Sequence, residues 1–154
     1  MCDSDYDLKT MQMSILMTPD KANFTGHLHG GDLLKYLDQV AYACATRYCG
    51  DYVVTLSVDK VLFKHPIYIS NFVTFYASVN YTGTTSMEIG IKVVSEDIKK
   101  RTVVHTNTCY FTMVALDENK KPIKVEQLNP ITPTQIRRYK DAKKRKEMRL
   151  QNKL

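Results

Sequence analysis

The sequence predicts an α+β fold in which one long central helix is wrapped by a curved antiparallel sheet of about five strands. The first observation is a single long helical pattern, early in the chain, with apolar residues at the i, i+3, i+4 and i+7 spacing of a packed helix. The second is a run of extended, partly alternating segments after it, with no second long helical pattern between them. A bent sheet around the helix would explain why the helix is apolar nearly all round.

The central helix begins between residues 29 and 32 and ends at Cys49. Gly30 and Gly31 permit close approach of the backbone at its N-terminus, where the first N–H groups have no intrahelical acceptor. Gly50 is the glycine expected just past a helix C-terminus. The apolar positions of this helix are Leu33, Leu34, Leu37, Val40, Ala41, Cys44, Ala45 and Tyr48.

One carboxylate, Asp38, lies among these apolar positions. Its helical neighbours one turn away are Leu34 and Ala41. A carboxylate is costly to bury unless it has partners or a chemical role. We therefore interpret Asp38 as a candidate catalytic acid; the alternative is a solvated or core-paired acid.

The extended segments are separated by turn residues such as Pro66 and Gly83. In the last and longest segment, the alternation predicts that Val103, Cys109 and Phe111 share one face, opposite a threonine-rich face. The predicted strands are residues 8–17, 52–63, 71–81, 85–95 and 102–116.

Length and composition suit one domain with enough core to fold without disulfides or metals. No apolar run approaches the roughly 18 residues of a membrane span. The acidic N-terminus lacks the basic and apolar regions of a signal peptide, so a cytoplasmic location is expected. The four cysteines show no CxxC or metal-ligand spacing and are expected to be small, mostly buried hydrophobes in a reducing compartment. They are Cys2, Cys44, Cys49 and Cys109.

The net charge of +6 is concentrated at the C-terminal end. From Pro133 to Leu154 there are nine basic and two acidic residues, so the remainder of the chain is nearly neutral. We expect a main domain over residues 1–128 and a linker with a basic helical tail over 129–154. The simplest interpretation of the tail is a solvated helix that partly packs on an oligomer neighbour; an anionic ligand, nucleic acid or an anionic membrane are the alternatives.

The stretch Asn23-x-x-Gly26-x-x-His29-Gly30-Gly31-x-Leu-Leu-x-x-x-Asp38 resembles the signature of hotdog-fold acyl-CoA thioesterases. The closer resemblance is to the group that contains the YciA-type hydrolases and the cytosolic brain-type acyl-CoA hydrolase. Residues 57–63, Pro66 and residues 83–88 also fit, and the resemblance covers roughly residues 8–116.

The resemblance implies a metal-independent enzyme of fatty acid metabolism that hydrolyses acyl-CoA, with coenzyme A as part of the substrate and no cofactor. The catalytic unit would be a homodimer with the site at its interface, assembled as a trimer of dimers. Asp38 would act as general base on water, or as nucleophile. N–H groups at Gly30 and Gly31 would polarise the carbonyl, and Asn23 of the facing protomer would orient water or substrate; ordinary turn chemistry is the alternative for Asn23.

The residues expected to bind substrate are a second set. Thr84 to Ser86 lie where the family places a loop near the pantetheine and nucleotide, and Lys64 and Arg101 could supply positive charge. Two histidines two residues apart, His27 and His29, are weak evidence for a metal when no third ligand is present. A structural or substrate-lining role is therefore expected, and His29 is assigned to the substrate site. The set is His29, Phe63, Lys64, Thr84, Thr85, Ser86 and Arg101.

Two rival functions are consistent with the same fold. One is a non-catalytic acyl-CoA-binding regulator whose basic tail touches DNA, although a sensor would not need the acid at Asp38. The other is a hotdog enoyl-CoA hydratase, whose Asp and His lie on the turn before the helix, whereas here the acid lies two turns inside it. Because Asp38 argues against the regulator, binding of nucleic acid is not expected.

Overall fold

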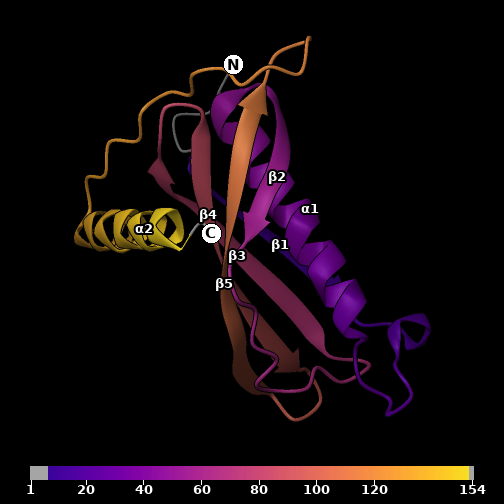
Figure 1. Cartoon of the computed structure of the whole chain (residues 1–154). Coiled ribbons are helices and arrows are strands. Elements are labelled where there is room, and N and C mark those ends of the chain that lie inside the picture. Colours follow the sequence, from indigo (N-terminus) through magenta and orange to yellow (C-terminus); the bar gives the residue numbers. More distant parts are fainter. Residues whose placement is uncertain (1–6, 153–154) are drawn as a thin grey trace.

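The computed structural model describes residues 7–152 and contains a five-stranded antiparallel sheet with a helix on each side (Figure 1). The strand order is β1-β3-β4-β5-β2, and the predicted α+β hotdog architecture is confirmed. Helix α1 lies along the inner face of the sheet, and helix α2 crosses the opposite face (Figure 1). The elements are β1 (Thr10–Leu16), a 3-10 turn (Pro19–Lys21), α1 (Gly30–Cys49), β2 (Tyr52–Val58), β3 (Phe72–Thr82), β4 (Ser86–Asp97), β5 (Thr102–Leu116) and α2 (Pro133–Gln151).

Helix α1 has both of the predicted ends. The imidazole of His29 caps its N-terminus by accepting the N–H of Gly31, and Gly50 ends it in the left-handed conformation at φ 76°. One face of α1 is buried in the core, but Leu34 and Tyr42 on the other face are exposed. The sheet of one protomer therefore covers only part of the apolar surface that the sequence pattern predicts to be buried.

The inner face of the sheet forms the core with α1. Alternate residues of the three central strands are fully buried there, among them Phe75, Ile89 and Phe111. The expectation that Val103 shares the face of Cys109 is wrong, because the register of β4 and β5 shifts opposite Val93 and Val94. This β-bulge reverses the alternation, and Val103 is 64% exposed.

Strand β2 is shorter than predicted. It ends at Val58 rather than continuing to Phe63, and the chain leaves the sheet after the N–H of Asp59 donates to the carbonyl of Tyr110 at 2.9 Å. The next backbone hydrogen bond along the chain is at Ile67, whose carbonyl accepts the N–H of Leu28 at 2.7 Å. Residues 60–66 therefore form a loop, named here the 60–66 loop.

Helix α2 packs on its own sheet, although most of its residues are exposed. Its packing on an oligomer neighbour stays a prediction. Its one buried residue is Ala142, and the ring of Tyr139 packs against Tyr81 of β3 with the centroids 4.9 Å apart. Arg145 donates two hydrogen bonds to Glu88 of β4, at 2.7 and 3.2 Å, and Glu88 is only 2% exposed. A charged helix can be held this way because each buried carboxylate oxygen has a guanidinium partner.

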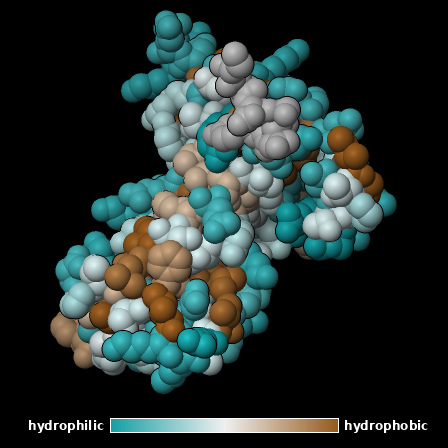
Figure 2. Space-filling model, turned by 180° about the vertical axis from the view of Figure 1, so that it is seen from behind, coloured by the Kyte–Doolittle hydropathy of each residue, from teal (hydrophilic) through white to brown (hydrophobic). Residues whose placement is uncertain are grey.

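The surface differs between the two ends of the molecule. The view from behind shows several patches of hydrophobic surface at the end where α1 begins, and mostly hydrophilic surface at the opposite end (Figure 2). Within residues 7–152, neither helix combines the length and apolar character needed to cross a membrane.

Candidate active site

The candidate catalytic acid lies in a cleft between α1 and the edge strand β2. Asp38 projects from the third turn of α1, on the helix face that the sheet leaves uncovered. The hydroxyl of Thr55, on β2, donates to Oδ1 of Asp38 over 2.6 Å. The cleft has a volume of about 360 Å³ and is lined by Asp38, Gln39, Tyr42 and residues 52–55.

Thr55 is a residue that the sequence reasoning missed. A hydrogen bond to a carboxylate at this distance is charge-assisted, so it fixes the rotamer of Asp38 and satisfies one of its two oxygens. No bond to Oδ2 is present among the described residues, so that oxygen is free to accept from water in the cleft. The only signal in the sequence was a threonine within a β-branched strand, which is ordinary strand composition.

The two glycines at the start of α1 differ in their hydrogen bonding. The N–H of Gly31 donates to Nδ1 of His29 at 3.1 Å, so it is engaged within the chain. Gly30 is half-buried, and a Cβ added to it would lie 3.8 Å from the ring of Phe63. Asp38 lies eight residues farther along, about 12 Å at the helical rise of 1.5 Å per residue. One protomer alone therefore holds the acid and the helix N-terminus well apart.

Asn23 lies in the hairpin that precedes α1, closed by the bridge between Ala22 and Leu28. Its side-chain oxygen accepts the N–H groups of Thr25 and His27 at 2.9 and 3.0 Å, which is the turn chemistry set against the catalytic interpretation. Its amide nitrogen makes no hydrogen bond to any described residue. The hairpin lies beyond the N-terminal end of α1 (Figure 1).

The residues predicted to bind substrate fall at two ends of the sheet. Phe63 and Lys64 lie in the 60–66 loop beside the start of α1, and Arg101 is in the turn between β4 and β5 at that same end. Thr84 and Thr85 lie at the opposite end, in the turn between β3 and β4, and Ser86 is the first residue of β4. A single protomer does not bring the two groups together, so their joint role in one site stays a prediction about an assembly.

The thiols of Cys44 and Cys109 are buried in the core and do not line this cleft. Burial raises the pKa of Cys44 and of Cys109 from 9.0 to about 12, which keeps both protonated near neutral pH. Cys2 lies outside the described residues. Between residues 7 and 152, no group of three or more His, Cys, Asp or Glu side chains is arranged to hold a metal ion.

Comparison with known proteins gives the family. Residues 25–102 match the model of the family described as "Thioesterase superfamily". The chain belongs to the thioesterase superfamily. This thioesterase is 57% identical to Protein VdlD of Helicobacter pylori over 143 residues, which is 93% of this chain and 82% of that protein. The predicted membership of the hotdog thioesterases is thereby confirmed.

Two solved structures extend the comparison of this thioesterase. An apo-hexameric acyl-CoA thioesterase superposes with a TM-score of 0.89 at 34% identity, covering 92% of this chain and 91% of that one. The acyl-CoA hydrolase of Staphylococcus aureus, solved with butyryl coenzyme A and coenzyme A, gives a TM-score of 0.84 at 30% identity over 91% of this chain and 85% of that one.

Proposed function

We propose that this thioesterase hydrolyses acyl-CoA to the free acid and coenzyme A, with Asp38 as the general base. The observation that carries the proposal is the carboxylate of Asp38, held through one oxygen by Thr55 in an open cleft. The free oxygen accepts a proton from water as that water attacks the thioester carbonyl carbon. When the C–S bond breaks, the proton passes to the leaving sulfur, so Asp38 is regenerated.

Variants of the S. aureus enzyme support this assignment. Its structures include variants in which an asparagine, an aspartate and a threonine are each replaced by alanine. The asparagine precedes the aspartate by 15 positions and the threonine follows it by 17. Asn23, Asp38 and Thr55 have the same separations in this chain.

The site is completed by a second protomer in this proposal. The uncovered face of α1 and the edge strand β2 together expose Leu34, Tyr42, Tyr52, Leu56 and Val58. Exposed large apolar side chains of this kind, beside an unpaired strand edge, favour association with another copy. The superposed hexameric enzyme supports an oligomer, and in such a dimer the helix N-terminus and Asn23 of one chain would serve Asp38 of the other.

Replacement of Asp38 tests the assignment of the base. Asp38→Asn keeps the size of the side chain and can still accept from Thr55, but it cannot take a proton from water. We expect it to assemble like the wild type and to lose at least about 100-fold in kcat. Thiol release from a panel of acyl-CoA chain lengths measures this, and near-normal turnover would overturn the assignment.

Mixing two inactive variants tests the shared site. Dimers formed from Asn23→Ala and Asp38→Ala chains contain one site with both changes and one with neither. Random reassociation of equal amounts should therefore restore about one quarter of the wild-type activity. Sites built within one chain would give no recovery, and Asp38→Ala mixed with Asp38→Asn is the matched control.

A further inference from the structure

The 60–66 loop borders the start of α1 but has few attachments of its own. Its middle residue Phe63 is the side chain nearest to Gly30, at the end of α1 where the carbonyl of a substrate would lie in the proposed function. Among the described residues, none within 60–66 makes a hydrogen bond or ion pair. Of its side chains, Val61 is partly buried against the core. The polar attachments of the loop lie at its two ends, at Asp59 and at Ile67.

The Ile67 end is fixed to the segment that leads into α1. Besides the hydrogen bond from Leu28, the ring of Tyr68 packs edge-on against His27 with the centroids 4.7 Å apart. This end of the loop therefore moves with the start of α1.

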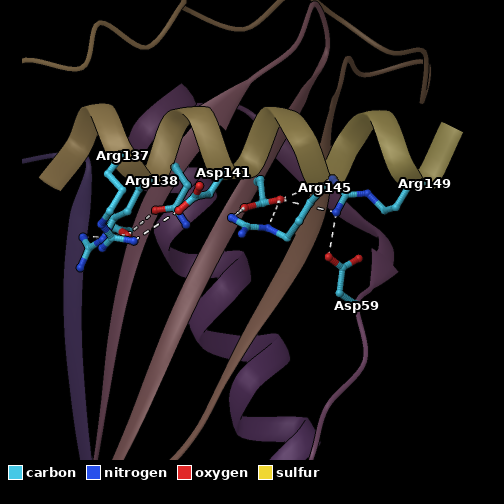
Figure 3. Close-up of polar contacts among 9 residues, drawn as sticks. Asp59, Arg137, Arg138, Asp141, Arg145 and Arg149 are labelled. Carbon is cyan, nitrogen blue, oxygen red and sulfur yellow. Dashed lines mark hydrogen bonds and ion pairs between the residues drawn. The ribbon is translucent and has the colours of Figure 1, made fainter. Parts of the chain in front are cut away.

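The Asp59 end is fixed by α2, from the far side of the sheet. Arg149 donates to Oδ2 of Asp59 at 2.8 Å and also reaches Glu88 at 3.4 Å (Figure 3). Arg145, one turn earlier, pairs with Glu88 and lies 3.6 Å over the ring of Tyr110, whose carbonyl accepts the N–H of Asp59. Both side chains of the Arg149–Asp59 pair are mostly buried, at 26% and 23% exposure, so water screens the pair less than a surface pair.

We propose that Arg149 is a positioning residue for the substrate site: through Asp59 it holds the 60–66 loop, and with it Phe63, against the start of α1. Helix α2 thereby acts as a brace for a loop on the other face of the sheet. The proposal rests on the proposed thioesterase function for its kinetic consequences, but the attachment of the loop does not depend on that function.

Steady-state kinetics of Arg149→Ala and Asp59→Asn test whether the Arg149–Asp59 pair positions the loop. If loss of the pair leaves the loop in its binding-competent position about a fifth of the time, KM rises about fivefold and kcat changes by less than about twofold. We expect this for Arg149→Ala and, in the same direction but more weakly, for Asp59→Asn, whose amide oxygen is a weaker acceptor than the carboxylate. We expect the double variant to be no worse than Arg149→Ala. Arg149→Lys keeps a cation that can reach Asp59 and should recover most of the loss.

The sign of the Asp59→Asn effect separates positioning from plain electrostatics. Coenzyme A is an anion, so loss of an arginine weakens its attraction, whereas loss of an aspartate strengthens it. A fall in KM for Asp59→Asn, or an unchanged KM for Arg149→Ala, would overturn the proposal. The matched control is Arg137→Ala, which removes the exposed pair with Asp141 at the other end of α2 and should leave KM unchanged.

Limited proteolysis gives a readout that needs no thioesterase activity. Lys60 and Lys64 are exposed in the loop and are sites for trypsin. Mass spectrometry of the early fragments should show cleavage at these two lysines that is at least about fivefold faster in Arg149→Ala, and unchanged in Arg137→Ala. Equal cleavage rates in the wild type and Arg149→Ala would overturn the brace. An inactive wild type whose loop is still protected by Arg149 would refute the proposed function and leave the brace intact.

Discussion

The hydrogen bond between Thr55 and Asp38 gives the most informative single perturbation. Thr55→Val is nearly isosteric and removes only the hydroxyl that donates over 2.6 Å to Oδ1 of Asp38. Without that donor, the carboxylate gains rotational freedom and loses the contact that aims its free oxygen into the cleft. The fold should be unaffected, because Thr55 lies at an exposed position of the edge strand β2.

The magnitude follows from the nature of this bond. A hydrogen bond to a charged group contributes about 1.5–3 kcal/mol. If all of it is needed to hold Asp38 in its reactive position, kcat/KM falls about 10- to 150-fold, since about 1.4 kcal/mol corresponds to a factor of ten. Thr55→Ser keeps the hydroxyl and should remain within about threefold of the wild type.

Steady-state thiol release on butyryl-CoA and longer substrates is the assay, with assembly checked by light scattering. The decisive comparison uses the Asp38→Asn background. If Thr55 acts through Asp38, then Thr55→Val should cause little further loss there, because residues that act as a unit are not additive. Full activity of Thr55→Val, or an equal loss in both backgrounds, would refute the reasoning.

Two further predictions concern stability. Arg145→Ala leaves the buried carboxylate of Glu88 with only the longer contact to Arg149, so urea unfolding should show a loss of about 3 kcal/mol, partly recovered by adding Glu88→Gln; equal stability of Arg145→Ala and the wild type would contradict this. The raised pKa values of the Cys44 and Cys109 thiols, about 12 against 9.0, mean that only the unfolded chain releases these protons between pH 9.0 and about 12. Stability should therefore fall as pH rises through that window, by about 1.4 kcal/mol per pH unit and thiol at most. Cys44→Ala should flatten the fall, and an unchanged slope would show that burial does not hold the proton.

The helices and strands could be predicted from the sequence because short-range rules determine them. The helical spacing, the glycine pair and Gly50 located α1 almost to the residue, and the strand of residues 102–116 was predicted at both ends. The motif that joins Asn23, His29 and Asp38 was equally readable, because it lies in one continuous stretch and its spacing is what family resemblance detects.

Only the tertiary structure determines the contacts between residues that are far apart in the chain. The bulge that turns Val103 outward depends on the register of two strands, and no alternation within β5 reveals it. Thr55 meets Asp38 only because β2 returns beside α1, and Arg149 meets Asp59 only because α2 crosses the outer face of the sheet. Composition described the basic tail as a solvated appendage, since a sequence does not show that Glu88 and Asp59 would be its partners. Local propensity therefore determined the elements, and long-range packing and charge pairing determined which side chains can act together.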